Sequence, residues 1–345
     1  MNIVVLCGGL SSERDVSITS GTGVARALRE RGHKAVLVDL YFGYTGEYNN
    51  PVEIFDRPQD DSVYSVSEQE PDLEKIKAQR NQDNDSLIGD NVIEICRAAD
   101  ITFMALHGDE GENGKVQATF DVAGVKYTGS GYLGSAVAMN KTLSKKLFEA
   151  YGIPTPPGLT VDRNQKEFGN VGFPCVVKPC SGGSSVGTSI VNTEDEYADA
   201  LAFAFKYEEK VIVEKYIKGR ELTVGVIEGV ATPVIEIIPK EGFYDYKNKY
   251  QAGLTIELCP APIDAETTER VQRLAEKVHD VLMIEAYSRA DFLMDEDDGE
   301  MYCLEANTLP GMTPTSLIPQ MAVEMGKSFG ELCEWIIEAS MRKYL

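Results

Sequence analysis

The sequence predicts an α/β protein in which an open parallel sheet is followed by two domains that mix helices and strands. Residues 1–40 read as strand, glycine turn, helix and strand, which is the opening of a parallel α/β unit. Strands and helices then alternate again up to about residue 128. The length of 345 residues favours two or three domains. We therefore expect domains at 1–129, 130–213 and 214–345.

The first domain follows from its apolar runs and from one interruption. A polar insertion at about 43–90 is rich in Asp, Asn, Gln, Glu, Tyr and Pro, and it has little periodicity apart from a helix near 72–80. The other expected elements are a strand at 3–6, a helix at 17–31, a strand at 35–40, a helix at 88–98, a strand at 101–106 and a helix at 114–122. We assign no role to the insertion.

The second and third domains are predicted from periodicity and from helix stop signals such as Gly152 and the prolines after it. In the second domain we expect helices at 132–139, 141–151 and 194–204 and strands at 175–178, 188–191 and 211–215. In the third we expect strands at 221–227 and 231–238, an amphipathic helix at 265–282, a hairpin near 289–308 and helices at 316–325 and 328–343.

Composition excludes several classes of protein. The formal net charge of −22 opposes nucleic-acid binding, which requires a basic surface. No apolar run approaches the ~18–20 residues of a membrane span, and the N-terminus reads as a first strand, not a signal peptide. Seven scattered cysteines without a Cys-x-x-Cys motif indicate reduced thiols and a cytoplasmic location. An acidic protein that handles a nucleotide must gather its lysines at one cleft.

Two strand-like segments near the C-terminal end carry the most informative charges. Side chains two residues apart on a strand share a face, so Arg289 neighbours Asp291. On the second strand Glu305 neighbours Asn307. If the strands pair around the turn-like segment 295–299, three oxygen ligands and one guanidinium meet. Such ligands suit Mg²⁺ that arrives with substrate phosphates, whereas the alternative is a solvated edge hairpin.

A Gly/Ser-rich loop from Lys178 to Gly187 joins two predicted strands. Its glycines allow backbone N–H groups to approach phosphate oxygens, and the strand-borne lysine adds a positive charge. The loop is not a Walker A motif, and by itself a flexible turn is the competing interpretation. Downstream, Glu214 and Glu221 frame a strand end that can offer acceptors to adenine and ribose, or that simply exposes charges.

Polar residues also mark the first domain. Glu13 lies in the first strand-to-helix junction, where open α/β sheets bind ligands, and it can receive an ammonium group. His107 similarly follows a predicted strand. The other two histidines, His33 and His279, are predicted on helix surfaces.

Taken together, these spaced motifs resemble those of D-alanine–D-alanine ligases of the ATP-grasp superfamily, over nearly the whole chain. The matching segments are 8–17, 106–114, 127–131, 139–141, 178–187, 214–221, 243–250, 289–291 and 304–316. The resemblance implies an ATP-grasp fold in which the second and third domains clasp ATP. It also implies Mg²⁺-dependent, ADP-forming ligation of two D-alanine molecules through a D-alanyl phosphate, for peptidoglycan synthesis. A cytoplasmic homodimer is implied as well.

The resemblance assigns roles residue by residue. ATP is expected to contact Lys141, Lys178, Ser181, Gly183, Ser185, Glu214, Lys215, Ile217, Glu221 and Lys249. Two Mg²⁺ ions, or Mn²⁺ in their place, are expected on Asp291, Glu305 and Asn307. Catalytic roles fall to Glu13, Ser184, Tyr250, Arg289 and Gly311, and the two D-alanine molecules are expected against Val16, His107, Ser316 and Leu317.

The chain also departs from the family pattern. Ser181 and Gly182 stand where many members carry Arg-Glu, which puts the hydrogen bonds of the phosphate loop in doubt, and Asn140 replaces the commoner Asp. Two alternatives remain at this point: a ligase of the same fold that accepts D-serine or D-lactate, and a non-catalytic nucleotide-binding paralogue.

Overall fold

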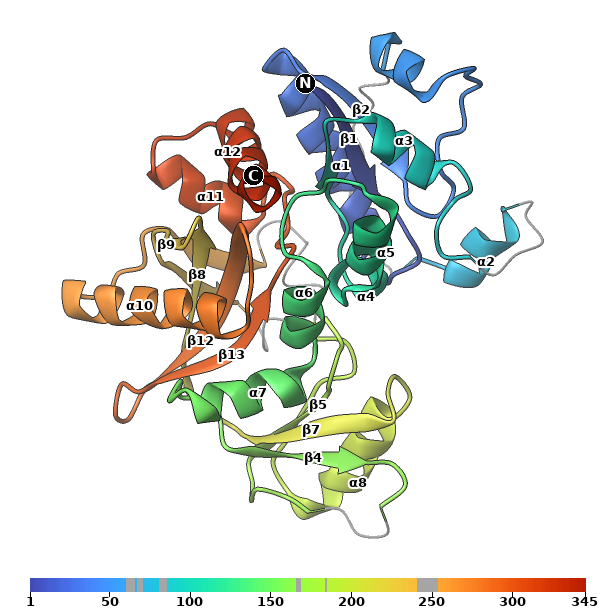
Figure 1. Ribbon diagram of the computed structural model, residues 1–345. Helices are drawn as coiled ribbons and strands as arrows, with labels where there is room; N and C mark the ends of the chain where they lie inside the picture. The colour runs from blue at the N-terminus through green and yellow to red at the C-terminus, as the bar shows by residue number, and fades with distance from the viewer. Residues whose placement is uncertain (60–65, 67–70, 81–85, 166–168, 184, 241–253) are drawn as a thin grey trace.

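The computed structural model describes residues 1–59, 66, 71–80, 86–165, 169–183, 185–240 and 254–345. These residues form three sheets, each with its own helices (Figure 1). One sheet is parallel and the other two are antiparallel, which confirms the predicted fold class. The predicted domain limits at 129 and 213 stay predictions.

The N-terminal sheet is parallel and has the strand order β2-β1-β3. Its strands are β1 (Asn2–Cys7), β2 (Lys34–Asp39) and β3 (Ile101–Met104), and its helices are α1 (Arg14–Glu30), α3 (Val92–Ala98), α4 (Asp109–Glu112) and α5 (Lys115–Ala123). The polar insertion contributes a 3₁₀ helix, η1 (Pro51–Asp56), and the short helix α2 (Leu73–Ala78), which lies inside the predicted range.

The central sheet is antiparallel and has the order β4-β7-β5-β6. Its elements are α6 (Tyr132–Met139), α7 (Lys141–Ala150), β4 (Gly158–Asp162), β5 (Cys175–Pro179), β6 (Ser189–Val191), α8 (Glu194–Ala204) and β7 (Lys210–Lys215). The sequence did not predict β4. Helix α7 begins after Asn140, whose side chain accepts a hydrogen bond from the backbone N–H of Leu143 at 3.0 Å and so caps the helix.

The third sheet has the order β11-β10-β8-β12-β13, with β9 paired to β8. Its strands are β8 (Gly219–Ile227), β9 (Val230–Ala231), β10 (Ile235–Pro239), β11 (Thr255–Leu258), β12 (Tyr287–Asp295) and β13 (Met301–Asn307). The helices of this region are α10 (Ala265–Val281), α11 (Leu317–Glu324), α12 (Phe329–Met341) and the 3₁₀ helix η2 (Arg342–Tyr344). The predicted strand at 231–238 is thus divided into β9 and β10.

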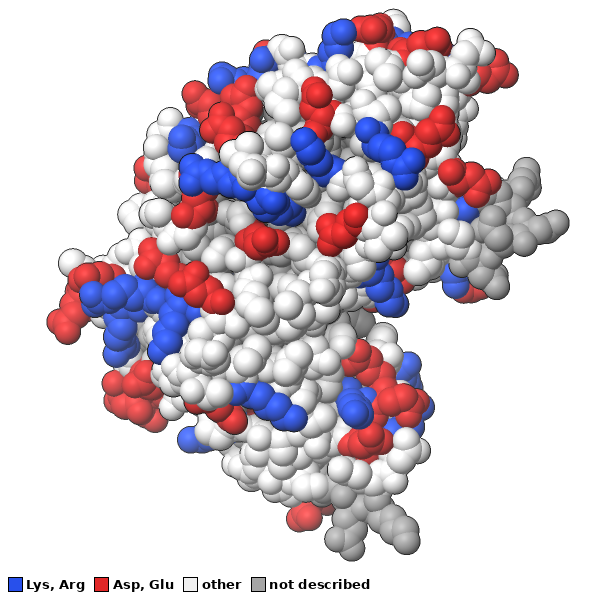
Figure 2. Space-filling view, viewed as in Figure 1, with Lys and Arg blue, Asp and Glu red and all other residues white. Residues whose placement is uncertain are grey.

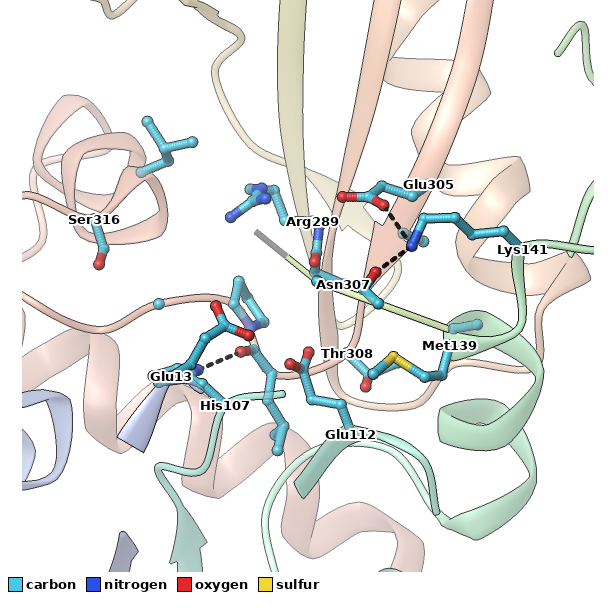
Figure 3. Close-up of a pocket in the computed structure, with 18 of the residues that line it drawn as sticks. Glu13, His107, Glu112, Met139, Lys141, Arg289, Glu305, Asn307, Thr308 and Ser316 are labelled. Atoms are coloured by element: carbon cyan, nitrogen blue, oxygen red, sulfur yellow. Dashed lines mark hydrogen bonds and ion pairs between the residues drawn. The ribbon is translucent and has the colours of Figure 1, made fainter. Parts of the chain in front are cut away.

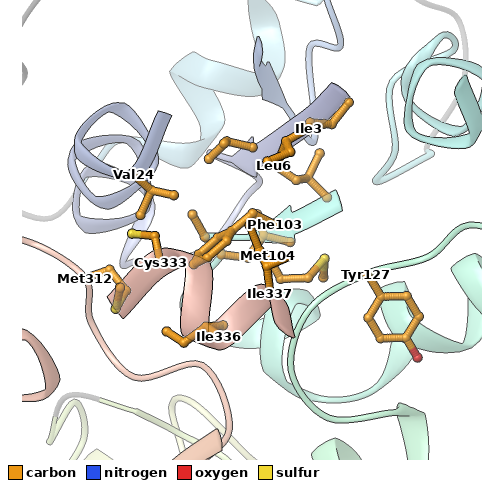
Figure 4. Packing of buried hydrophobic residues seen from close by; sticks show 14 of the residues in the cluster. Ile3, Leu6, Val24, Phe103, Met104, Tyr127, Met312, Cys333, Ile336 and Ile337 are labelled. Atoms are coloured by element: carbon orange, nitrogen blue, oxygen red, sulfur yellow. The ribbon is translucent and has the colours of Figure 1, made fainter. Parts of the chain in front are cut away.

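The last helix, α12, returns to the N-terminal sheet, as Figure 1 shows. Its Cys333, Ile336 and Ile337 pack in one cluster with Ile3 and Val24 (Figure 4). This cluster also contains Met312 and Leu317, which precede and begin α11. The N-terminal and C-terminal ends of the chain therefore share a core.

On the face shown in Figure 2, the Lys and Arg side chains lie interspersed with Asp and Glu. Of the helices that the structure describes, none has both the length and the apolar character needed to cross a membrane.

Candidate active site

A cleft of about 470 Å³ is lined by residues from both antiparallel sheets. Its walls combine apolar side chains with nine charged ones, and a cleft of this kind suits a charged ligand such as a nucleotide. Most of the residues predicted to bind ATP line it, namely Lys141, Lys178, Gly183, Ser185, Glu214, Lys215, Ile217 and Glu221. Ser181 lines a neighbouring groove instead, and Lys249 lies outside the described residues.

Glu214, on β7, lines the cleft and joins two lysines, of which Lys178 lines the cleft and Lys145 does not. One of its carboxylate oxygens lies 2.7 Å from Nζ of Lys178, and the other lies 2.7 Å from Nζ of Lys145. Burial raises the pKa of Glu214, but the two ammonium groups outweigh it and hold this pKa below its ordinary value. Glu214 is therefore a buried carboxylate whose position is set by two cations.

The two lysines respond differently to this arrangement. Burial lowers the pKa of Lys145. Burial also acts to lower the pKa of Lys178, but Glu214 and Glu305 raise it above its ordinary value. Lys145 also donates hydrogen bonds to Oγ1 of Thr155 at 2.8 Å and to a backbone carbonyl at 2.7 Å. Lys145 was not among the predicted site residues, although its position four residues after Lys141 places both lysines on one helix face.

Lys141, at the first position of α7, links the phosphate loop to the hairpin of β12 and β13. Its ammonium group donates to the carbonyl oxygen of Gly182 at 2.6 Å and forms an ion pair with Glu305 at 3.1 Å (Figure 3). Its backbone N–H donates to the carbonyl oxygen of Cys180 at 2.9 Å. One lysine thus holds two elements that are about 40 and 160 residues further along the chain.

The predicted hairpin is present, with Arg289 opposite Asn307 and Asp291 opposite Glu305. The guanidinium group of Arg289 donates two hydrogen bonds to the carboxylate of Asp291, at 2.9 and 2.8 Å. The same carboxylate accepts from Oγ1 of Thr223 at 2.6 Å and from Nδ2 of Asn307 at 3.1 Å. The three predicted oxygen ligands therefore lie together on paired strands.

These ligands fit a divalent cation by their chemistry. Two carboxylates and a side-chain amide form a hard-oxygen set of the kind that Mg²⁺ binds together with phosphate oxygens. Arg289 and Lys141 neutralise the two carboxylates in the structure. Within the described ranges, no group of three or more His, Cys, Asp and Glu side chains is placed to hold a metal, and the predicted set depends on Asn307 as its third member.

A smaller chamber of about 70 Å³ adjoins the cleft and shares Lys141, Gly182, Gly183 and Glu305 with it. Figure 3 shows its walls: Glu13, His107 and Glu112 face the strands that carry Arg289 and Asn307. Of the residues predicted for the amino-acid site, Glu13, His107, Arg289, Gly311, Ser316 and Leu317 line the chamber. Val16 is fully buried in α1 and does not line it. Ser184 and Tyr250 lie outside the described residues.

His107 is held in one orientation by two hydrogen bonds. Its Nδ1 lies 3.0 Å from the carbonyl oxygen of Leu309, so Nδ1 carries the proton, and its Nε2 accepts from Oγ of Ser20 at 3.0 Å. Burial lowers the pKa of His107, which keeps the ring neutral. The sequence placed this histidine correctly at a strand end. His279, predicted on a helix surface, is instead buried and bonded to Oγ of Ser288 at 2.8 Å.

Glu112 is a third acidic residue of the chamber, beside Glu13 and Glu305, and it was not among the predicted site residues. It accepts a hydrogen bond from the backbone N–H of Gly108 at 2.6 Å. Burial and then the charge of Glu13 raise the pKa of Glu112 to about 8. In the sequence, the only feature that indicated a role for Glu112 was its position in the short segment after His107. The structure shows that this segment is helix α4.

On the far side of the chamber, the chain turns tightly around Ser316. Oγ of Ser316 accepts from the backbone N–H of Thr313 at 2.9 Å. A Cβ atom at Gly311 would lie only 2.6 Å from this oxygen, so any larger residue at this position would force the Ser316 hydroxyl to move. The turn leaves the backbone of Gly311 at the chamber wall.

Two antiparallel sheets enclose a cleft lined by lysines, and paired carboxylates lie where this cleft meets a small polar chamber. This arrangement defines an ATP-grasp enzyme. Comparisons with known proteins narrow this class. The family model "D-ala D-ala ligase N-terminus" matches residues 2–130, and "D-ala D-ala ligase C-terminus" matches residues 147–338. The chain belongs to the D-alanine–D-alanine ligase family.

Individual members of the family are similar to this chain over nearly their whole length. The chain is 42% identical to the D-alanine–D-alanine ligase of Lacticaseibacillus casei, with 100% of this chain and 97% of the relative covered. It is 40% identical to that of Geobacter sulfurreducens, with 97% and 92% covered. Among solved structures, the D-alanine–D-alanine ligase from Bacillus anthracis complexed with ATP is similar at a TM-score of 0.74 and 32% identity, with 99% and 98% covered.

Proposed function

We propose that this chain joins two D-alanine molecules into D-alanyl-D-alanine, with ATP converted to ADP and phosphate, and so provides the dipeptide for peptidoglycan synthesis. Family membership places it among ADP-forming ligases. One observation carries the proposal: the nucleotide cleft and the amino-acid chamber share Lys141, Gly182, Gly183 and Glu305. A phosphoryl group at this junction lies within reach of a carboxylate in the chamber.

The first step makes the first amino acid reactive. A carboxylate is a poor electrophile, and transfer of the γ-phosphoryl group to it gives an acyl phosphate and ADP. The ammonium groups of Lys141 and Lys178 neutralise the charge of the transferring phosphate. Asp291, Glu305 and Asn307 would hold Mg²⁺, which when bound adds positive charge at the phosphates. Glu13, at the opposite wall, receives the ammonium group of this D-alanine.

In the second step the amine of another D-alanine attacks the acyl phosphate, phosphate leaves, and a peptide bond forms. Arg289 and the backbone N–H of Gly311 stabilise the oxyanion of the tetrahedral intermediate. Asp291 fixes the Arg289 guanidinium through two hydrogen bonds, which orients it before the reaction. Ser316 and Leu317 border the chamber where the second D-alanine is expected.

The alternatives are less well supported. A non-catalytic paralogue would have no need to retain Arg289, Asp291, Glu305 and Asn307 in one cluster. Enzymes that use D-serine or D-lactate typically differ at Lys249, Tyr250 or Leu317, and this chain does not. A cytoplasmic location and a homodimeric state remain predictions based on the family.

The proposal is tested by ADP release from the purified protein with ATP, Mg²⁺ and D-alanine, D-serine or D-lactate in turn. With D-alanine we expect ADP and D-alanyl-D-alanine in equal amounts. When D-serine or D-lactate is present together with D-alanine, we expect little of the mixed product. ADP release that requires no amino acid, or D-alanine that yields no dipeptide, would refute the assignment.

A further inference from the structure

The phosphate loop, which Lys141 contacts at Gly182 from within the nucleotide cleft, is also held by residues outside that cleft. Ser181 has a short, uncharged side chain and Gly182 has none, so neither can anchor the loop through a charged side chain of its own. Yet Gly183 and Ser185, further along the loop, line the cleft at defined places. Contacts at the two ends of the loop, near Ser181 and Gly187, fix the position of its backbone.

Glu208 holds the first end. Its carboxylate accepts a hydrogen bond from the backbone N–H of Ser181 at 2.9 Å. Glu208 lies in the turn after α8, where its own N–H contacts the carbonyl oxygen of Ala204 at 3.4 Å, and Ala204 is fully buried in the core of the central domain. Glu208 is therefore attached to the packed core beside the central sheet.

The carboxylate of Glu208 acts from the outer side of the loop. Glu208 and Ser181 both line a groove of about 580 Å³ that adjoins the cleft, and neither lines the cleft itself. A negative charge in the cleft would repel phosphate oxygens. On the outer side it can hold the backbone without contacting the nucleotide.

Tyr207, the preceding residue, supports the second end. Gly187 has a φ of +73°, and a Cβ atom there would lie 2.7 Å from the Tyr207 ring and 2.8 Å from Cγ of Pro179. The Tyr207 ring packs edge-on against Phe203 of α8, with 5.7 Å between ring centroids. Two consecutive residues of one turn thus contact both ends of the loop.

We infer that Glu208 is a positioning residue for ATP binding: it fixes the backbone of the phosphate loop at Ser181, and Tyr207 supports it at Gly187. The inference rests on the proposed function, because it assigns the loop to ATP phosphates. A charged acceptor makes a stronger hydrogen bond than a neutral one, and donors fixed in advance cost no ordering when the nucleotide binds. Loss of Glu208 therefore weakens ATP binding with little effect on D-alanine.

The experiment compares Glu208→Ala, Glu208→Asp and Glu208→Gln with wild type. Glu208→Ala removes the acceptor, and we expect about a tenfold rise in KM for ATP, with KM for D-alanine within about twofold of wild type. Glu208→Asp keeps the charge but shortens the reach, so KM for ATP should also rise. Glu208→Gln keeps an acceptor oxygen at full length and should stay within about threefold of wild type.

The matched control is Glu209→Ala. Glu209 is the next residue, and it pairs with Arg163 at 3.0 Å on the surface. Its replacement by Ala should leave both KM values unchanged. Equal KM for ATP in Glu208→Ala and Glu209→Ala would overturn the inference, as would a Gln variant no better than the Asp variant. The Asp and Gln variants decide the question even where the Ala variant does not fold.

Binding without turnover separates this inference from the proposed function. Calorimetric titration with a non-hydrolysable ATP analogue requires no D-alanine, and it should show the same order of affinities among the variants. A wild type that forms no dipeptide would defeat the proposed function. Unchanged analogue affinity in Glu208→Ala and Glu208→Asp would defeat the role of Glu208.

Discussion

At the scale of single residues, Glu214 shows how one buried charge organises several others. It lies between Lys145 and Lys178, at 2.7 Å from each ammonium group, and only 3% of its side chain is exposed. The sequence predicted Glu214 as an acceptor for adenine, a role that stays a prediction. The geometry adds that Glu214 sets the position of Lys178, which is expected at the phosphates.

Glu214→Gln should destabilise the fold, because two buried cations then lose their common counter-charge. We expect a loss of about 3 kcal/mol in the free energy of unfolding near neutral pH, measured by urea denaturation. Because the folded-state pKa of Glu214 is lowered, its contribution is complete above its unfolded pKa of roughly 4.3 and is lost as the pH falls through the folded value. The difference between variant and wild type should therefore shrink below about pH 4.

The control for this prediction is Glu209→Gln, since Glu209 pairs with Arg163 at the surface. Exposed pairs contribute little, so that change should alter the unfolding free energy by less than about 1 kcal/mol. A Glu214 variant as stable as the Glu209 variant would contradict the counter-ion role.

At the scale of elements, alternation along β12 and β13 was the strongest signal in the sequence. It predicted the hairpin and the residues that share a face, because a strand has a fixed period of two. The pairing of Asp291 with Glu305 confirms that reasoning. The pairing register then shifts between Asp291 and Phe292, and no local sequence pattern predicted this bulge.

Other elements could not be predicted from the sequence, because they depend on contacts between distant segments. Strand β4 is short and follows prolines, and only its pairing with β7 makes it a strand. Strand β11 depends in the same way on β10. The partners of Lys145 and Glu208 lie 69 and 27 residues away in the chain, since Lys145 contacts Glu214 and Glu208 contacts Ser181. Periodicity describes one element at a time, and such contacts arise only from tertiary packing.

The hairpin supports a prediction about Asp291. Asp291→Asn removes a carboxylate that orients Arg289 and that is expected to bind Mg²⁺, so kcat should fall by about a hundredfold or more while the fold remains intact. Turnover at saturating ATP and D-alanine and the far-UV spectrum measure the two effects. Asp297→Asn, in the exposed turn of the same hairpin, should match wild type. Nearly normal turnover of Asp291→Asn at low Mg²⁺ would rule out the assigned role.

At the scale of the whole molecule, both the distribution of charge and the path of the chain determine which residues meet at the site. The protein carries a net charge of −22, yet Lys141, Lys178 and Lys215 all line the nucleotide cleft, as expected for an acidic protein that binds ATP. Helix α12 closes the fold by packing on the N-terminal sheet. Because the amino-acid chamber takes walls from both ends of the chain, this closure positions Glu13 opposite Arg289.

The C-terminal contacts suggest that both ends of the chain unfold together. The hydroxyl of Tyr344 accepts from the backbone N–H of Tyr127 at 2.9 Å and donates to its carbonyl oxygen at 3.1 Å. Trp335, the single tryptophan, lies on α12 and donates at 2.8 Å to a carboxylate oxygen of Glu228, in the turn between β8 and β9 of the third sheet. Tryptophan fluorescence therefore reports on the contact between α12 and that sheet.

Tyr344→Phe leaves the N–H of Tyr127 without its partner hydroxyl, and we expect a loss of about 1–3 kcal/mol in unfolding free energy. In urea, tryptophan fluorescence and far-UV circular dichroism should give coincident transitions for wild type, and both midpoints should shift together in the variant. Tyr151→Phe, at a side chain that is 58% exposed, should leave both midpoints in place. A fluorescence transition that precedes the dichroism transition would show that α12 detaches first, and the shared core would then not make the two ends of the chain one cooperative unit.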